Sequence, residues 1–270
     1  MPIASARIAA FRELHAGGCF TIPNPFDAGS ARLLATLGFP ALATTSSGFA
    51  ATLGRADMSV SRDELVAHVG AIAAATELPL NADAERCYSE ELSGIAETIA
   101  LIADAGAAGV SIEDWNPATN AIDTINLATA RVGAAVAAAA ESSIMLTARC
   151  ENHIRGVSDL DDTITRLCAY RDAGADVVYA PGLVDLVQIR RVVQEVGRPV
   201  NVLLLGGLTV GALAEVGVRR VSVGGSLAWV AFGAMVDAAT ALRDTGMIPK
   251  GSPSLDRPLA AAAFAPRGLS

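Results

Sequence analysis

The sequence predicts a closed (β/α)8 barrel, an α/β fold of the TIM-barrel type, and three observations support this expectation. The chain has 270 residues, and one such barrel needs roughly 250. Short apolar runs alternate with longer stretches in which apolar residues recur at helical spacing, as at Leu65, Val69 and Ile72. No hairpin signal separates neighbouring apolar runs, so each predicted strand should be followed by a helix and then by a parallel strand.

Eight apolar runs are the predicted strands, and each one ends in polar residues or glycine. They cover residues 20–23, 41–45, 78–82, 109–112, 144–148, 176–179, 199–204 and 220–223. Four of the intervening helices should end at a glycine in a left-handed turn, at Gly38, Gly106, Gly174 and Gly217. An open doubly wound sheet would show the same alternation, but Pro-Asn-Pro-Phe-Asp at 23–27 replaces the glycine-rich turn that such a sheet places after its first strand. The barrel is therefore the preferred fold.

The composition is that of an apolar, acidic protein. Hydrophobic residues make up 52% of the chain and aromatic residues only 4%, so the core has to be built from Ala, Val, Leu and Ile. The 20 basic and 28 acidic side chains give a formal net charge of −8, and no basic run occurs, so nucleic acid is not an expected partner. The apolar runs are shorter than the about 20 residues that span a bilayer, so no membrane role is expected.

Two further features concern location and domain boundaries. The four cysteines show no CxxC spacing, and Arg7, Arg12 and Glu13 interrupt the N-terminal stretch where a signal peptide would lie. We therefore expect reduced thiols in a cytoplasmic protein. No long linker divides the chain, so residues 1–250 are predicted to form one catalytic barrel domain. Residues 251–270 are rich in Pro and Ala and are expected to form a C-terminal tail outside the barrel, where a neighbouring subunit could cover it.

Acidic side chains follow three of the predicted strands, at the barrel end where active sites of this fold lie. Asp83 and Glu85 follow one strand, Glu113 and Asp114 follow the next, and Asp57 lies in the loop after an earlier strand. Carboxylates that converge this closely repel unless a cation or protons intervene, and an all-oxygen set suits Mg²⁺ or Mn²⁺ better than zinc. We interpret Asp57, Asp83, Glu85 and Glu113 as a metal site and Asp114 as a helix cap. The alternative is that all of them cap helices.

A basic residue and a polar turn complete the predicted site. Arg149 ends the strand at 144–148, where a guanidinium could hold a substrate carboxylate through two hydrogen bonds. An internal ion pair with Glu151 or Glu113 is the alternative for this residue. The run Thr45-Ser46-Ser47-Gly48 supplies hydroxyl and backbone N–H donors that could cradle the same carboxylate, although Ser-Ser-Gly is also an ordinary turn. The candidate substrate-binding residues are Thr45, Ser46, Ser47, Gly48 and Arg149, and the candidate catalytic residues are Arg149, Glu113 and Asp57.

The histidines and the paired glycines receive structural interpretations. His15 and His68 lie on predicted helices, and His153 has no partner at a recognisable spacing, so we take all three as structural or surface groups. The glycine pairs at 206–207 and 224–225 follow the last two predicted strands. We interpret them as close-packing turns rather than as a phosphate site.

Several stretches together resemble the isocitrate lyase and phosphoenolpyruvate mutase superfamily over residues 20–229. They are NPFDAGSARLLATLGFPALATTSSGFA from Asn24, GRAD ending at Asp57, NADAERCY with Asp83 and Glu85, AGAAGVSIED with Glu113, and TARCENHI with Arg149. One stretch alone would be a weak signal. Together, in this order and at the spacing of barrel strands, they are specific.

The resemblance implies a barrel whose last helix is exchanged between subunits, and hence a homo-oligomer, either a dimer or a homotetramer. It implies a cofactor, Mg²⁺ (or Mn²⁺), held mainly by Asp83. It also implies that the other carboxylates act through water and that a small carboxylic acid substrate is held by Ser47, Gly48 and Arg149. Members of the superfamily make or break C–C or C–P bonds next to a 2-oxo acid and pass through an enolate. The residues named by the resemblance are those that the strand ends indicate.

One loop departs from the superfamily's pattern. Its lyases carry a Lys-Lys/Arg-Cys-Gly-His loop after the strand that matches Glu113, whereas residues 115–120 read Trp-Asn-Pro-Ala-Thr-Asn. Because that cysteine is absent, we expect neither isocitrate lyase nor 2-methylisocitrate lyase activity. We also expect no essential cysteine, although Cys87 and Cys150 should lie near the mouth of the barrel.

The predicted function is that of a Mg²⁺-dependent lyase that cleaves a C–C bond next to a 2-oxo or 2-hydroxy carboxylic acid through an enolate. Arg149 and the cation would stabilise the negative charge that develops in such a step. Two alternatives stay open. One is a C–P bond enzyme of the phosphonopyruvate hydrolase or phosphoenolpyruvate mutase type. The other is a barrel that binds a small carboxylate without catalysis, which the altered loop would favour.

Overall fold

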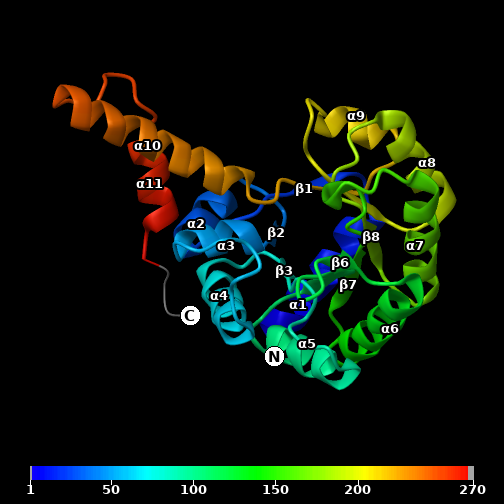
Figure 1. The fold of residues 1–270 in the computed structure, drawn as a ribbon. Coiled ribbons are helices and arrows are strands. Elements are labelled where there is room, and N and C mark those ends of the chain that lie inside the picture. Colours follow the sequence, from blue (N-terminus) through cyan, green and yellow to red (C-terminus); the bar gives the residue numbers. More distant parts are fainter. Residues whose placement is uncertain (1, 267–270) are drawn as a thin grey trace.

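Eight parallel strands form a nearly closed barrel in the computed structural model, which describes residues 2–266 (Figure 1). They are β1 (Phe20–Ile22), β2 (Leu42–Ala43), β3 (Leu80–Asp83), β4 (Gly109–Glu113), β7 (Met145–Arg149), β8 (Val177–Tyr179), β9 (Val200–Leu203) and β10 (Arg220–Ser222). Their order around the barrel is β1-β10-β9-β8-β7-β4-β3-β2. The end strands meet where the Ala43 N–H donates to the Pro23 carbonyl oxygen at 3.1 Å. The predicted TIM barrel and its eight strands are confirmed.

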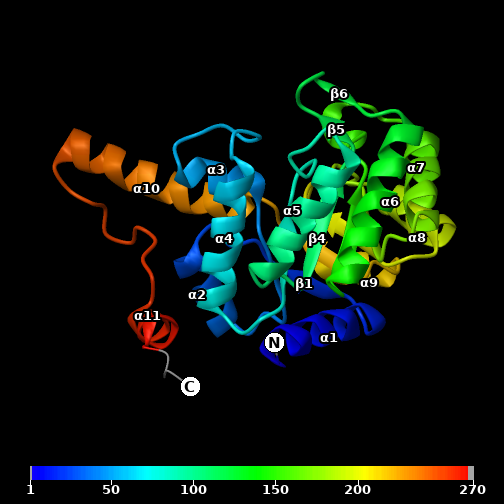
Figure 2. The same ribbon diagram turned by 90° about the horizontal axis from the view of Figure 1, so that it is seen from below.

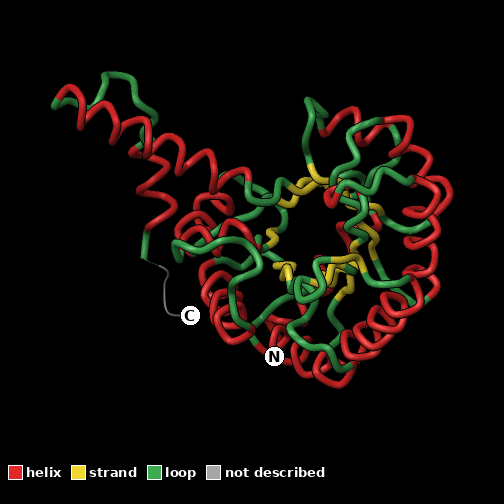
Figure 3. The backbone as a smooth tube through the Cα atoms, in the orientation of Figure 1, coloured by secondary structure: helices red, strands yellow, loops and turns green. Residues whose placement is uncertain are grey.

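Helices surround the ring of strands, as Figure 3 shows. They are α2 (Ala28–Thr36), α3 (Ser46–Thr52), α4 (Arg62–Ala75), α5 (Leu92–Asp104), α6 (Ile125–Glu141), α7 (Leu160–Asp172), α8 (Leu186–Val196) and α9 (Val210–Glu215). Local sequence specifies several of their ends. Asp27 and Ser61 begin α2 and α4 with capping boxes, in which each side chain accepts a hydrogen bond from the third helical N–H. The four glycines predicted to end helices all have positive φ, for example 105° at Gly174.

The core lies between the barrel wall and the helices. Ile95, Ile99 and Ile102 recur on one face of α5 and are fully buried; burying one such side chain contributes roughly 1.5–3 kcal/mol. Helix α1 (Pro2–Ala16) crosses one end of the barrel (Figure 2), where Phe11 packs with Phe20 in a second apolar cluster. Because most residues of that cluster lie at or before the beginnings of their strands, α1 covers the N-terminal end and leaves the C-terminal ends as the mouth.

A short antiparallel hairpin departs from the predicted pattern. β5 (Trp115–Asn116) pairs with β6 (Ala121–Ile122), so the expectation of no hairpin was wrong for this segment. Asn120 makes the turn with a φ of 52°, a left-handed conformation in which asparagine is enriched. Strands of two residues are too short to show a period of two in a sequence. Figure 2 places the hairpin at the end of the barrel opposite α1, which is the mouth.

The C-terminal helices leave the barrel. α10 (Ser226–Thr245) projects away from it, and α11 (Arg257–Phe264) returns to lie beside α2, where Arg32 donates a hydrogen bond to the Ala265 carbonyl oxygen (Figure 1). The part of the expected tail up to residue 266 therefore lies outside the barrel, against a helix of the same chain; residues 267–270 lie outside the described residues. No helix among residues 2–266 is long and apolar enough to cross a membrane.

Candidate active site

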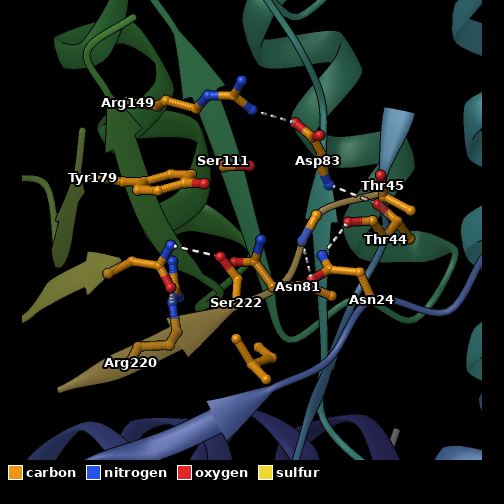
Figure 4. Close-up of a pocket in the computed structure, with 14 residues that line it drawn as sticks. Asn24, Thr44, Thr45, Asn81, Asp83, Ser111, Arg149, Tyr179, Arg220 and Ser222 are labelled. Carbon is orange, nitrogen blue, oxygen red and sulfur yellow. Dashed lines mark hydrogen bonds and ion pairs between the residues drawn. The ribbon is translucent and has the colours of Figure 1, made fainter. Parts of the chain in front are cut away.

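Three strand ends bring opposite charges together at the mouth. β3 ends at Asp83, β4 at Glu113 and β7 at Arg149, and the last two lie directly opposite each other in neighbouring strands. The Arg149 Nη1 atom is 3.4 Å from Glu113 Oε2 and 3.8 Å from Asp83 Oδ1. Figure 4 shows Arg149 and Asp83 facing each other across the pocket. The carboxyl ends of parallel barrel strands all lie at the same end of the barrel, so residues far apart in the chain meet here.

Glu85 and Asp57 join the same group of charges. Glu85 follows β3 with a φ of 48°, and its carbonyl oxygen accepts a hydrogen bond from the Glu113 N–H at 2.9 Å. Burial, followed by the nearby charges of Asp83 and Asp57, raises the pKa of Glu85 to about 8. Burial and, to a smaller extent, the charge of Asp83 also raise the pKa of Asp57, while a hydrogen bond from Ser46 acts to lower it. Glu85 thus interacts electrostatically with Asp83 and Asp57, and Glu113 interacts with Asp83 and Glu85.

Glu113 is also buried, with 3% of its side chain exposed. Burial raises its pKa well above the usual range, although the Arg149 guanidinium opposes this shift. One carboxylate oxygen of Glu113 and one of Glu85, in each case Oε1, are buried without a hydrogen-bond partner among the described residues. Burying such an atom unpaired costs about 1–3 kcal/mol or more. An additional cation or bound protons would remove that cost.

The donor set fits a hard divalent cation in charge and in atom type. Within residues 2–266 no three His, Cys, Asp or Glu side chains are arranged so that they could already hold a metal ion. The mouth nevertheless has more carboxylates than cations, it offers two unpaired buried oxygens, and all its donors are oxygen. Oxygen donors suit Mg²⁺ or Mn²⁺. Side-chain rotations would have to bring them into coordination.

Arg149 makes the internal ion pairs that the sequence left as its alternative interpretation. Its Nε donates to Glu151, and its guanidinium faces Glu113. The side chain also lines the cavity in the barrel mouth and lies 5.5 Å from the centre of the Tyr179 ring. An ion-paired guanidinium held in this way is already oriented, and only part of it is engaged. Arg149 can therefore keep its internal ion pairs and still bind a ligand. That this ligand is the carboxylate of a substrate stays a prediction.

Residues 45–48 form the start of α3 rather than a free loop. Thr45 caps this helix, and its Oγ1 accepts the Gly48 N–H at 3.3 Å. A side chain at Gly48 would collide with Thr45, since a Cβ there would lie 2.6 Å from the Thr45 methyl carbon. The Ser46 N–H points to Asp83 Oδ2 at 3.4 Å, and the Ser47 hydroxyl lies 3.3 Å from that of Thr45. Within this set, Thr45 lines the cavity.

The cavity itself continues inward from the mouth between the strands. It has a volume of about 50 Å³, well above the roughly 10–15 Å³ that one water molecule needs by this measure. Sequence reasoning missed most of its wall, although a signal existed: polar residues two apart within a strand, as at Asn81 and Asp83 or at Arg220 and Ser222, face the same side. The lining residues drawn in Figure 4 are Ile22, Asn24, Ala43, Thr44, Thr45, Asn81, Asp83, Ser111, Arg149, Tyr179, Asn201, Arg220, Ser222 and Gly224.

Hydrogen bonds of Asn24 and Arg220 hold the inner wall of this cavity. The Asn24 side chain accepts the N–H groups of Val223 and Gly224 at 3.0 and 2.9 Å and donates to the Thr44 carbonyl oxygen at 2.9 Å. The buried Arg220 donates to Asn201 Oδ1 at 2.9 Å, and burial lowers the pKa of Arg220 to about 10. The inner wall is polar and hydrogen-bonded, whereas the mouth has the acidic charge.

Other predicted residues take structural positions. Asp114 caps no helix, which corrects the interpretation from sequence: it accepts hydrogen bonds from the Tyr170 hydroxyl at 2.6 Å and from the Glu151 N–H at 2.8 Å. Cys87 and Cys150 are fully buried, and burial raises the pKa of Cys87 to about 12 and that of Cys150 well above its usual range. A thiol that stays protonated is a poor nucleophile or base.

The histidines also lie in structural positions. His15 is buried beside Arg220, and burial, followed by that charge, lowers its pKa to about 3. His68 stacks on the Phe49 ring at 3.7 Å between centroids, and burial lowers its pKa to about 4. His153 Nε2 lies 3.1 Å from the Thr163 hydroxyl. Neither His15 nor His68 lines the cavity described above.

A model of the family described as phosphoenolpyruvate phosphomutase matches residues 11–243. The chain belongs to this family. The resemblance to the isocitrate lyase and phosphoenolpyruvate mutase superfamily is thereby confirmed. The match covers the barrel from α1 to most of α10 and contains every predicted site residue.

Relatives of this phosphoenolpyruvate phosphomutase family member include proteins with and without an assigned reaction. A crystal structure from Burkholderia cenocepacia J2315, classed provisionally as a lyase/mutase, is 46% identical and superposes with a TM-score of 0.93 over 98% of both chains. An uncharacterized protein of Mycobacterium tuberculosis H37Rv is 33% identical over 90% of this chain and 93% of its own length. The oxaloacetate decarboxylase of Pseudomonas putida GB-1 is 29% identical over 84% of this chain and 82% of its own.

Proposed function

We propose that this family member is a divalent-metal-dependent lyase that cleaves a C–C bond next to a 2-oxo or 2-hydroxy carboxylic acid. The observation that supports it is the excess of acid at the mouth, where Arg149 pairs with Asp83 and Glu113 while Glu85 and Glu113 each bury an unpaired oxygen. A binding barrel for a simple carboxylate has no need of so many acids, because they repel the ligand. They are useful where a cation offsets their charge.

Each candidate residue has a proposed part. Asp83 is the main metal ligand, and Asp57, Glu85 and Glu113 complete the set, directly or through water. Mg²⁺ (or Mn²⁺), when bound, would polarise the carbonyl or hydroxyl oxygen of the substrate. The Arg149 guanidinium binds the substrate carboxylate with Thr45 and the first N–H groups of α3 as further donors, and its charge stabilises the enolate left when the C–C bond breaks. We assign catalytic roles to Arg149, Glu113 and Asp57, where the two acids orient the guanidinium and water.

Oxaloacetate is the first substrate to test. It is a small 2-oxo acid, and it is the acid named for the Pseudomonas relative. The experiment follows pyruvate release from oxaloacetate with Mg²⁺ and with excess chelator. We expect the rate above the metal-catalysed background to need both protein and metal. Asp83→Asn should abolish that rate and weaken Mn²⁺ binding, while the exposed Asp63→Asn should change neither.

The same assay separates the alternatives. Release of inorganic phosphate from phosphonopyruvate, or its conversion to phosphoenolpyruvate, would replace the C–C lyase with the C–P bond enzyme. Oxalate binding without turnover of any of these acids would leave the non-catalytic barrel. Asp83→Asn protein that still binds Mn²⁺ like the parent would place the metal elsewhere.

A further inference from the structure

Glu151 is a buried acid to which the function proposed above gives no part. It lies two residues beyond the end of β7 and is completely inaccessible to solvent. One of its oxygens accepts the Nε hydrogen of Arg149, and the other accepts the Nε hydrogen of Arg155 at 3.2 Å. A buried carboxylate between two guanidinium groups holds both in place, because moving either would leave its charge unpaired.

Arg155 extends this contact to the hairpin. It ends the 3-10 turn η1 (His153–Arg155), and the centre of its guanidinium lies 4.1 Å from the centre of the Trp115 ring. Such a cation–π contact is worth about 0.5–1 kcal/mol at an exposed site and more when desolvated. Trp115 is the first residue of the β5–β6 hairpin. A continuous series of contacts thus connects Arg149, Glu151, Arg155 and Trp115.

The hairpin also borders the acidic side of the mouth. Pro117 in its turn lines, together with Glu85 and Met58, a hollow of about 220 Å³. The two ends of the hairpin are attached to β7 through Asp114, whose carbonyl oxygen accepts the Asp123 N–H at 2.8 Å. The position of the hairpin therefore affects the space above the carboxylates, and the contacts through Glu151 relate that position to the Arg149 guanidinium.

We propose that Glu151 is a positioning residue that couples the Arg149 guanidinium to the β5–β6 hairpin through Arg155 and Trp115. The position of the hairpin and the binding of the substrate carboxylate by Arg149 then depend on each other. The inference rests on the proposed function for the role of Arg149, but the coupling itself is a property of the protein without substrate. Through this coupling, Glu151 and Arg155 affect substrate binding. They do so by way of Arg149 and Trp115 rather than through the acids proposed to bind the metal.

Trp115 gives the test a direct signal. The chain has two tryptophans, so Trp229→Phe leaves Trp115 as the only one, and this background serves every variant. We expect Glu151→Gln to raise the acrylamide quenching constant of Trp115 about twofold, because Arg155 loses its anchor. Arg155→Met should raise it as well, and Glu151→Gln should add nothing further in that variant. Arg191→Met, which removes exposed ion pairs with Glu195 of α8 and Asp161 of α7, should leave quenching unchanged.

Kinetics supply the second measurement. Glu151→Gln should raise KM for the substrate about tenfold and change kcat by less than about threefold, since binding of the carboxylate is weakened. The inference would be overturned by equal quenching in Glu151→Gln and its background. Additive effects of Glu151→Gln and Arg155→Met on quenching would also overturn it, as would an unchanged KM in Glu151→Gln. If Glu151→Gln does not fold, the partly exposed Arg155→Met tests the same link. A parent that turns over no substrate would contradict the proposed function, and the quenching measurements would still decide the coupling.

Discussion

At the scale of residues, the mouth of the barrel is defined by an excess of acid. The Arg149 guanidinium pairs with Asp83, Glu113 and Glu151, and the charges of Asp83 and Asp57 act on the nearby Glu85. The pKa of Glu85 and that of Glu113 are raised, because burial and neighbouring acids disfavour the ionised forms. Groups of this kind gather at functional sites more often than elsewhere. The charge balance is what makes a cation a reasonable occupant.

Replacing Arg149 by lysine tests the carboxylate-binding role at this scale. Lysine keeps the charge but loses the planar fork of donors, so we expect kcat/KM to fall more than tenfold, or at least about 1.4 kcal/mol of transition-state binding. Steady-state kinetics measure the effect, and Arg191→Lys on the surface is the matched control. Parent-like kinetics in Arg149→Lys would leave the residue with its ion pairs alone.

At the scale of elements, the start of α3 connects the helix to the site. Thr45 serves two purposes, since its hydroxyl caps the helix and its side chain lines the cavity. The same cap orients the Ser46 N–H toward Asp83. A backbone N–H at the beginning of a helix is a good donor to an anion, because it has no partner within the helix. The start of α3 therefore contributes to the candidate site through its backbone as well as through the Thr45 side chain.

Thr45→Val tests this double role, with Thr209→Val as its pair. Both threonines cap a helix through the same hydrogen bond, so each substitution should lower the free energy of unfolding by about 1 kcal/mol. Only Thr45 lines the cavity described above. We therefore expect a rise of several-fold in KM for Thr45→Val and none for Thr209→Val, measured beside urea unfolding curves. Similar KM values in the two variants would restrict Thr45 to capping.

At the scale of the whole molecule, the exposed α10 is the unusual feature. It projects from the barrel and leaves large apolar side chains in solvent, including Trp229, Val230, Met235 and Val236. Several large apolar side chains left in solvent on one helix are typical of an interaction surface. We propose that a second copy covers it, by the helix exchange expected from the resemblance, so that residues 1–250 act as a catalytic domain in a dimer or tetramer.

Light scattering after gel filtration checks the assembly. We expect the parent to have the mass of a dimer or tetramer, and Val230→Glu combined with Val236→Glu to shift it toward the monomer, because two charges would be buried at the interface. Arg243→Glu, at an already polar position of the same helix, should not. A monomeric parent at tens of micromolar would disprove the proposed assembly.

The stability of the fold should depend on pH through its buried histidines. The pKa of His68 is lowered to about 4 by burial, with Asp27 opposing, whereas an unfolded histidine titrates near 6.5. The unfolded state therefore binds more protons below that value, and the contribution of neutral His68 is complete above pH 6.5 and decreases as the pH falls toward 4. Between pH 7 and pH 5 the loss should be on the order of 2 kcal/mol.

His68→Phe removes this titration and keeps the stacked ring. Urea unfolding at pH 7 and pH 5 should show a smaller loss of stability in the variant than in the parent, by about the same 2 kcal/mol. The remaining dependence should combine His15, whose lowered pKa of about 3 reduces stability as the pH falls, with Glu85, whose raised pKa of about 8 acts in the opposite direction. Parallel losses in parent and variant would mean that His68 is protonated in the folded protein.

The sequence by itself determined the barrel, its eight strands and the acids at their ends. These features are encoded locally: an apolar run that turns polar at Asp83 or Glu113 marks a buried strand and its open end. The family resemblance followed from the same stretches. The two-residue strands of the hairpin and the start of α3 were missed, because so few residues contain no period and a capped first turn looks like a loop.

Only the tertiary structure decided which of these groups meet. Arg149 pairs with Glu113 across a sheet, and Arg220 lies 3.3 Å from His15 although 205 positions separate them in the chain. Such distances depend on the order and stagger of the strands, and no local pattern contains them. Burial follows from the same packing, so the raised pKa of Glu85 and the contacts of Glu151 with two arginines could be found only in the folded chain. The sequence determines which chemical groups are present, whereas folding sets the distances between them and removes the water around them.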